Sequence, residues 1–455
     1  MIQTPAARAR AIALAAVLSL ALCGAPTLAA DPFASNNGFY PDPASKAWTG
    51  TYRSLSFDYP TKPVDSGWTK RAPRRALTVA AAPEYARLLK AFVEPAMRGM
   101  IEQPDTWSPA KAGWYDMIWV AEGPDASSGR EAILGAFSGQ VILQDTFASS
   151  GLKVDMQNHT VVYYDAAAAS MLHRLWANPF APNRGAVKFP EGAMVIKAAA
   201  VSPTPEQWPV VEGSTTWHVY RPPVAQLLAH DKDPKAPLTP VVTPLRFMQF
   251  DVIVKDSVAS PETGWVFMTF IYDKSATGSG TWDKLVPLGA MWGNDPQWAR
   301  RPTGRGPNRE PLQQSWINPA APRYAMESLG WGGRMSGPID VARRHNVLLT
   351  DGSDLKEAAT SSCLSCHGTA QYPFVANLYP SPNRSFPPEG SVFPMFVPGS
   401  DDWARWFQNR PGTVPMNANQ GAVALDYDML IMFALMNYDA AAGSDRFVQK
   451  RPRVH

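Results

Sequence analysis

Apolar residues recur at helical spacing in three stretches of the chain. Residues 82–103 carry apolar side chains three and four positions apart, which predicts an amphipathic helix with one face on a core. Residues 165–176 have helical composition, with four alanines in succession. Residues 425–437 are apolar around much of the predicted helix. They are fewer than the about 20 apolar residues that cross a bilayer, so we expect a buried helix and no membrane span.

Strand patterns dominate the middle of the chain. Runs of β-branched and aromatic residues, some of them alternating with polar ones, predict strands at residues 114–120, 192–198, 247–254 and 264–272. A further short element begins at residues 161–164. The glycine-containing turn at 277–281 lacks the lysine–serine pair and the strand-to-helix context of a phosphate-binding loop. These patterns predict a β-rich N-terminal region.

Composition supports short strands and long ordered loops. The 455 residues include 44 prolines and 16 tryptophans but only 18% charged residues. The formal net charge is +3, which is too small to indicate binding to nucleic acid or to an anionic membrane.

The first 30 residues resemble a cleaved secretory signal. Arg8 and Arg10 precede an apolar run, and small residues at Ala29 and Ala30 suit cleavage there. We therefore expect a periplasmic protein. Lipid attachment at Cys23 is not favoured, because the bulky Leu22 precedes it.

Once the signal is removed, the remaining two cysteines form a single motif, Cys363-Leu364-Ser365-Cys366-His367. The pattern C-x-x-C-H is the attachment signature of a c-type haem. The thiols of Cys363 and Cys366 form thioethers with the two porphyrin vinyl groups, and His367 supplies the proximal iron ligand.

Three other interpretations of the motif are weaker. A structural zinc site needs four protein ligands, and the other histidines show no paired spacing. A thioredoxin-type dithiol belongs in a βαβ pattern, which is absent from the sequence. A disulfide across two residues has poor geometry.

The sequence on both sides of the motif predicts a domain boundary, two short helices and a proline-rich loop. A domain boundary is expected between residues 332 and 351, followed by a short helix at 354–360 that leads into Cys363. Nine prolines between Cys366 and Met416 predict a loop that wraps around the haem. Within it, residues 401–409 predict a helix that Ser400 caps. Its face of Trp403, Trp406 and Phe407 suits either porphyrin contact or ordinary core packing.

A short helix, C-x-x-C-H, a proline-rich wrap, a Pro-Met pair and a closing helix together resemble a class I cytochrome c domain over residues 341–455. The resemblance implies a small all-α domain and a methionine as second axial ligand. The best match is Met416, in Gly412-Thr413-Val414-Pro415-Met416-Asn417, and the long wrap leaves Met395 as a rival. We therefore expect a multidomain α+β protein, with a β-rich domain over residues 31–340.

The N-terminal region is loosely similar to uncharacterised exported single-haem proteins. The stretches that carry this similarity contain Phe189-Pro190-Glu191-Gly192-Ala193 with Lys197-Ala198, Gly264-Trp265-Val266-Phe267-Met268-Thr269-Phe270, and Gly337-Pro338-Ile339-Asp340. The similarity implies no substrate.

Three functions remain open at this point. The first and preferred one is one-electron transfer by a single covalent haem c to a redox partner protein. The second is a haem enzyme, such as a peroxidase, an oxygenase or a dehydrogenase that uses the N-terminal domain. The third is a haem-based sensor of a small ligand. The polar residues His159, His173, His218 and Glu191 are expected to be structural, and the sequence fixes neither a substrate nor an oligomeric state.

Overall fold

The computed structural model describes residues 31–306, 310–341, 343–348, 354–374, 376, 378–380, 397–418 and 421–443. The predicted signal segment, residues 1–30, lies outside these ranges. Within them, the centre of the molecule is an antiparallel sheet of nine strands in the order β1-β3-β4-β6-β7-β8-β9, with β2 on β3 and β5 on β6. The strands are β1 (Trp114–Tyr115), β2 (Phe137–Ile142), β3 (Met156–Asp165), β4 (Met194–Val201), β5 (Thr216–Arg221), β6 (Val241–Lys255), β7 (Trp265–Tyr272), β8 (Leu285–Met291) and β9 (Ser315–Ile317).

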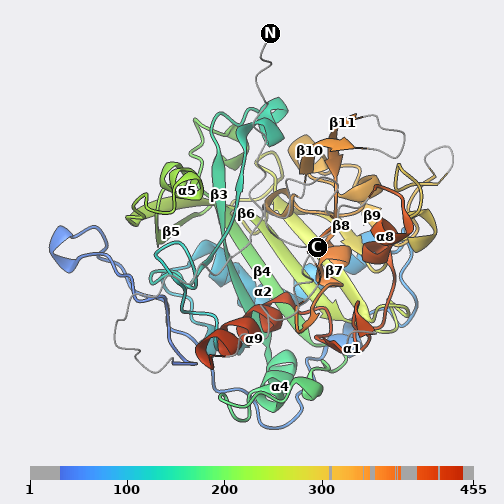
Figure 1. Ribbon diagram of the computed structural model, residues 1–455, viewed down its shortest axis with the longest axis horizontal. Helices are drawn as coiled ribbons and strands as arrows, with labels where there is room; N and C mark the ends of the chain where they lie inside the picture. The colour runs from blue at the N-terminus through green and yellow to red at the C-terminus, as the bar shows by residue number, and fades with distance from the viewer. Residues whose placement is uncertain are drawn as a thin grey trace, which may run out of the picture.

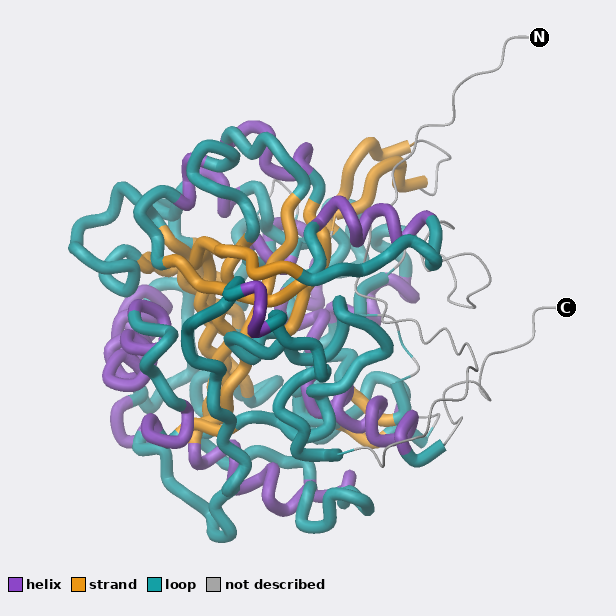
Figure 2. Tube along the Cα trace, turned by 90° about the vertical axis from the view of Figure 1, so that its left-hand side faces the viewer, coloured by secondary structure: helices purple, strands orange, loops and turns teal. Residues whose placement is uncertain are grey.

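Helices and loops cover both faces of this sheet (Figures 1 and 2). In Figure 1, α2 lies behind the strands, and the orange-to-red C-terminal segment with α9 lies in front of them. The helices are α1 (Trp68–Arg71), α2 (Ala82–Glu102), α3 (Pro109–Ala112), α4 (Ala166–Leu175), α5 (Val224–Lys232), α6 (Arg323–Met326), α7 (Cys363–His367), α8 (Asp401–Ala404) and α9 (Met429–Ala441).

Strand β7 shows why the sheet is buried on both sides. All eight of its residues are buried, so its sequence is a continuous apolar and β-branched run and not an alternating one. Val266 and Met268 face the cluster that contains the apolar stripe of α2. Trp265 and Phe267 face a second cluster, to which α4 and α9 contribute. Thus β7 separates two cores.

The expected all-α C-terminal domain is wrong. After residue 340 the described chain forms four strands, and α9 packs on the same sheet as the N-terminal region. Ile431 and Leu435 of α9 lie in the second cluster together with Trp265 and Phe267 of β7, because the broad apolar surface of α9 needs a partner that the short C-terminal elements do not provide. The strands are β10 (Arg343–Leu348), β11 (Asp354–Ala359), β12 (Gln371–Tyr372) and β13 (Val423–Ala424).

The expected helix at 354–360 is also wrong. This segment is β11, which pairs antiparallel with β10 from Arg343↔Ala359 to Leu348↔Asp354. Ladder hydrogen bonds to a neighbouring strand overrode a weak local helix preference. The helix expected at 401–409 begins where predicted, at Ser400, whose side chain accepts a hydrogen bond from the Trp403 backbone. It continues only as a short 3-10 turn to Phe407.

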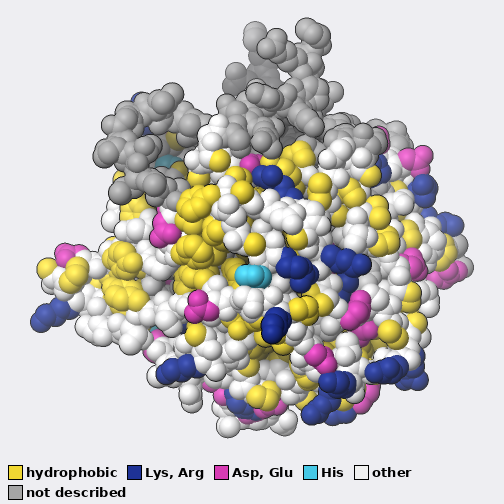
Figure 3. Space-filling model, turned by 90° about the horizontal axis from the view of Figure 1, so that it is seen from below, with side chains coloured by type: hydrophobic (Ala, Val, Ile, Leu, Met, Phe, Trp, Pro, Cys, Tyr) yellow, Lys and Arg dark blue, Asp and Glu magenta, His cyan; other side chains and the backbone are white. Residues whose placement is uncertain are grey.

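Charges are mixed on the surface. The face seen from below carries Lys and Arg side chains interspersed with Asp and Glu and with apolar patches (Figure 3). None of the helices in the described ranges combines the length and the apolar character that a membrane crossing requires.

Candidate haem-attachment site

The motif Cys363–His367 forms the five-residue helix α7, and serines fix its start. Ser362 is the N-cap and accepts a hydrogen bond from the Ser365 backbone, while the Ser365 hydroxyl accepts one from the Ser362 backbone at 2.9 Å. This is a reciprocal capping box with Ser at its third position. Because so short a helix has little stability of its own, the cap and its tertiary contacts hold it in place.

Two backbone hydrogen bonds dock α7 against a preceding loop. The Cys363 N–H donates to the Met335 carbonyl at 3.0 Å, and the Trp331 N–H donates to the Ser361 carbonyl at 2.8 Å. Gly330 permits this approach, because a Cβ there would lie 2.0 Å from the Ser361 carbonyl oxygen.

The imidazole of His367 is held on two sides. Its Nδ1 lies 2.8 Å from the carbonyl oxygen of Tyr427, and its ring contacts Phe267 of β7 edge-on, with centroids 4.9 Å apart. Burial lowers the pKa of His367 to about 4, although the bond to Tyr427 opposes this shift. The ring is therefore neutral at pH 7, and a proton on Nδ1 leaves the Nε2 lone pair free for a metal.

A buried ion pair positions the Tyr427 carbonyl. Asp426 accepts hydrogen bonds from the Lys255 ammonium at 2.8 Å, the Trp265 indole at 2.7 Å and the Phe189 backbone at 2.8 Å. The Asp426 side chain is fully buried, and that of Lys255 is 8% exposed. Asp426 and Tyr427 both have positive φ, 47° and 67°, a conformation that non-glycine residues adopt at a cost. The ion pair holds this strained turn against the sheet.

The two cysteines of the motif are not joined in a disulfide. Cys363 and Cys366 are free and half-buried. Burial, and next the nearby Asp340, raise the pKa of Cys366 to about 12, and the same causes raise that of Cys363. Cys363 packs against the second cluster, whose other partly buried apolar side chains include Phe137, Val162, Ile253, Phe374, Leu378 and Met429.

With two free thiols and one neutral imidazole on a single short helix, the residues present fit a c-type haem. Within the described chain, the motif included, no group of three or more His, Cys, Asp or Glu side chains could hold a metal ion on its own.

Charged side chains lie beside these cysteines. The Lys197 ammonium of β4 lies 2.6 Å from Asp340 and 3.2 Å from Asp251 of β6. The Gln249 amide donates to both carboxylates, at 2.7 Å to Asp340 and 2.8 Å to Asp251. We call Lys197, Gln249, Asp251 and Asp340 the polar cluster. The two carboxylates raise the pKa of the Cys363 thiol, and the Lys197 ammonium lowers it.

The sequence did not identify the polar cluster as a site. Gln249 and Asp251 occupy the same face of one strand within an apolar run, and Lys197 interrupts another such run. Inward polar residues in a buried strand are unusual enough to have served as a signal. Their meeting with Asp340, 89 residues after Asp251, could not be read from the chain.

Met416, the predicted second axial ligand, is brought near the motif. The adjacent Asn417 exchanges two hydrogen bonds with the side chain of Gln371, four residues after His367. The Met416 side chain packs on a cluster that includes Trp331, Trp403 and Phe407. The rival Met395 lies outside the described residues. Ligation by either methionine stays a prediction.

The polar residues expected to be structural lie away from α7. His159 is buried, with Nδ1 3.3 Å from the Ser138 hydroxyl, and Glu191 accepts hydrogen bonds from Ser257. His218 contacts the ring of Trp48. His173 lies in the last turn of α4.

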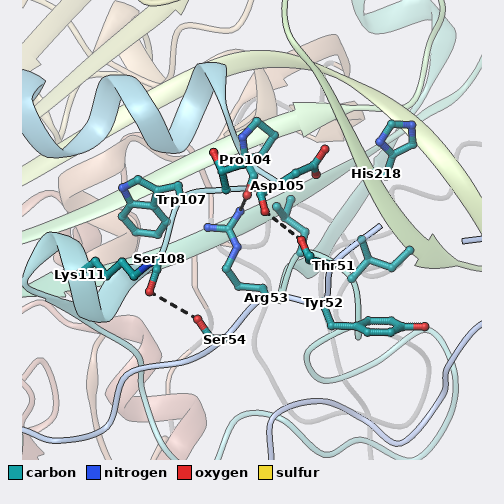
Figure 4. A pocket seen from close by; sticks show the side chains of 13 residues that line it. Thr51, Tyr52, Arg53, Ser54, Pro104, Asp105, Trp107, Ser108, Lys111 and His218 are labelled. Carbon is teal, nitrogen blue, oxygen red and sulfur yellow. Dashed lines mark hydrogen bonds between the residues drawn. The ribbon is translucent and has the colours of Figure 1, made fainter. Parts of the chain in front are cut away.

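A separate pocket of about 240 Å³ lies beside the C-terminal end of α2 (Figure 4). Arg53 crosses it to donate to the Pro104 carbonyl at 2.6 Å, and its guanidinium lies over the Trp107 ring. Thr51 donates to the Asp105 carbonyl at 2.8 Å. None of the haem-motif residues lines this pocket.

No known protein family, no curated protein and no solved structure matches this chain.

Proposed function

We propose that this protein is a c-type cytochrome that carries one haem on Cys363, Cys366 and His367 and transfers single electrons. The observation that carries the proposal is the bond of His367 Nδ1 to the Tyr427 carbonyl, on a helix whose two thiols are free. A metal-binding histidine commonly donates its other ring N–H to such an acceptor. When bound, the haem supplies a one-electron iron couple.

In this proposal the protein's own groups bind and orient. Cys363 and Cys366 fix the porphyrin edge, and His367 presents Nε2 to the iron. The Lys255–Asp426 pair keeps the Tyr427 carbonyl in place and so orients the imidazole, while burial keeps the imidazole neutral. Export to the periplasm, with cleavage near Ala29 or Ala30, is part of the proposal, as is a partner protein that exchanges electrons.

The test is covalent attachment. The full chain is produced with its N-terminal segment in a bacterium that has a haem-attachment system, then denatured and extracted with acidic acetone. We expect the haem to stay with the protein and to give the spectrum of a haem with two thioethers. The variant Cys363→Ala should show a spectrum with one thioether, and Cys363→Ala/Cys366→Ala should release all haem. Haem that washes out of the wild-type protein would refute the proposal.

A haem enzyme is the second candidate, and the polar cluster favours it, because ionisable groups beside Cys363 could exchange protons during catalysis. The two functions differ at the iron. An electron carrier with a methionine ligand is low-spin and does not bind carbon monoxide readily, whereas an enzyme with an open position is high-spin and binds it.

A further inference from the structure

The polar cluster contains more negative than positive charge. It combines one ammonium, Lys197, with two carboxylates, Asp251 and Asp340, and lies beside the two predicted haem-bearing cysteines. Burial by itself would lower the pKa of Lys197, but Asp340 and Asp251 raise it well above its ordinary value. Lys197 therefore stays charged, and one carboxylate charge in the cluster is left unbalanced.

The two carboxylates share their donors. Both accept from the Lys197 ammonium and from the Gln249 amide, and Asp251 accepts a further hydrogen bond from Thr269 at 2.7 Å. Burial raises the pKa of Asp251; Lys197 opposes this rise and Asp340 adds to it. Burial and the neighbouring carboxylate both favour the protonated form of Asp251, so Asp251 is the group of the cluster that can take up a proton.

The described surroundings of the pair are otherwise free of strong charge. The groups that face it are Lys197 from β4, Gln249 from β6, Thr269 from β7, and the thiols and imidazole of α7. None of the three charged residues forms a hydrogen bond with His367 within the described chain.

The fold holds Asp340 in place and leaves it accessible. Asn158 donates to the Ile339 carbonyl at 2.9 Å, and Gln140 donates to the Val341 carbonyl at 2.9 Å, so both neighbours of Asp340 are tied to the sheet. The Asp340 side chain is 32% exposed and that of Asp251 is 9% exposed. A proton can therefore reach Asp251 from solvent past the more exposed side chain of Asp340.

We propose that the polar cluster takes up one proton when the attached haem gains one electron, so that the protein moves a proton together with each electron. This inference rests on the proposed function. The balance is simple: a one-electron donor reduces the ferric iron, and a proton from water converts one carboxylate of the pair to a carboxylic acid. No bond to the haem forms or breaks in the cluster.

The expected coupling between reduction of the iron and proton uptake by the polar cluster follows from Coulomb's law. A change of one unit charge at the iron shifts the pKa of a nearby carboxylic acid through their Coulomb interaction, and a shift of one pKa unit is a tenfold change in proton affinity. Loss of one positive charge at the iron therefore raises the proton affinity of Asp251, and we expect a rise of about tenfold. Reoxidation releases the proton.

The test is the reduction potential of the haem-loaded full chain, measured with redox mediators from pH 5 to pH 9. We expect a region in which the equilibrium constant for reduction falls about tenfold per pH unit, a slope of 59 mV for one electron. Redox-difference infrared spectra should show a protonated carboxyl band appearing on reduction. A flat potential across the range would overturn the inference.

Variants identify the proton-binding group. Asp251→Asn and Asp340→Asn should each remove the slope and raise the potential, since each deletes a negative charge near the iron. The matched control is Asp256→Asn, another buried carboxylate, which accepts hydrogen bonds from Trp68 and Tyr85 in the cluster packed on α2. It should keep the wild-type slope. A slope that persists in both cluster variants assigns the proton elsewhere and refutes the inference.

Different results would refute the proposed function and the proton coupling. A protein without covalent haem refutes the proposed function. A protein with covalent haem but a pH-independent potential refutes only the proton coupling. If a cluster variant does not fold, the pH dependence of the wild-type reduction potential and the wild-type infrared band still test the proton coupling.

Discussion

The Nδ1 atom of His367 lies 2.8 Å from the carbonyl oxygen of Tyr427, which comes sixty residues later in the chain. The bond joins the motif helix to the turn before α9. Its acceptor is a backbone atom, so a substitution cannot remove it directly, but the residues that place Tyr427 can be changed.

Asp426→Asn should destabilise the protein strongly. The change leaves the Lys255 ammonium buried without its partner, and breaking a buried ion pair in this way costs about 3–5 kcal/mol. The free energy of unfolding, measured with urea, should fall by about that amount. The ligand-field bands of the attached haem should shift as well, because the Tyr427 carbonyl loses its support.

The control for this prediction is Asp65→Asn, which removes an ion pair to Lys70 on the surface. Exposed pairs contribute little, so its unfolding curve should match the wild type. Equal losses in the two variants would mean that the Asp426 turn plays no special part.

Ser362→Ala should weaken α7. The substitution removes the N-cap acceptor for the Ser365 backbone and should cost about 1 kcal/mol of stability. Thermal unfolding of the haem-free protein measures this directly. Ser362→Thr keeps a hydroxyl at the cap and should recover most of the loss; if it behaves like alanine, the cap is not the cause.

Met416→Ala should abolish a sulfur-to-iron charge-transfer band in the ferric protein, lower the reduction potential and open the iron to carbon monoxide. A thioether ligand favours ferrous iron, which gives the direction of the potential change. Met395→Ala is the matched comparison. A band that disappears only in Met395→Ala would reassign the ligand, and a wild-type protein that is high-spin would favour the enzyme or sensor.

His159 should make the protein less stable in acid. Burial, with a smaller effect of Arg221, lowers the pKa of His159 to about 3. Below pH 6.5 the unfolded chain takes up a proton that the folded protein cannot accept, so stability falls as the pH drops from about 6.5 towards 3. At pH 5 the loss from this group is about 2 kcal/mol.

His159→Gln should remove that part of the acid sensitivity. Urea unfolding of both proteins at pH 7 and pH 5 gives the comparison. The difference between the two pH values should be about 2 kcal/mol smaller in the variant, and an unchanged difference would show that His159 is protonated in the folded state.

The sheet and its long helices could be predicted because their signals are local. The apolar stripe at 82–103 matches α2, which spans Ala82–Glu102, and residues 264–272 match β7. Residues 165–176 contain α4, begun by the Asp165 cap. The predicted strand at 114–120 is a strand only at Trp114–Tyr115, because the rest of that apolar run packs in the second cluster without a ladder partner.

The C-terminal fold could not be predicted in the same way. The motif and its flanking elements suit a small helical domain, yet α9 packs on the apolar face of a sheet whose last strand ends at Ile317, more than a hundred residues before Met429. It begins at Met429, four residues later than predicted, because Asp428 caps it. The division of the chain at residue 340 stays a prediction.

The candidate site likewise has a part that the sequence predicts and a part that it does not. Cys363, Cys366 and His367 are adjacent in sequence, so the motif alone was enough to name them. Tyr427, Asp426 and the polar cluster reach α7 only through long-range packing. The polar residues within buried strands mark the cluster as unusual, but the local sequence does not show that it lies near α7.

The order of the elements along the chain sets the order in which they can assemble as the chain emerges N-terminus first. All nine strands of the central sheet lie between Trp114 and Ile317, so the whole sheet precedes the motif. The surface on which α7 docks can therefore exist before Cys363 is made, whereas Tyr427 and α9 follow last. Until they arrive, the imidazole of His367 has no acceptor and the thiols have no cover. Under the proposed function, the fold thus leaves an interval in which an attachment enzyme can reach the two cysteines, and the docking of α9 ends this interval.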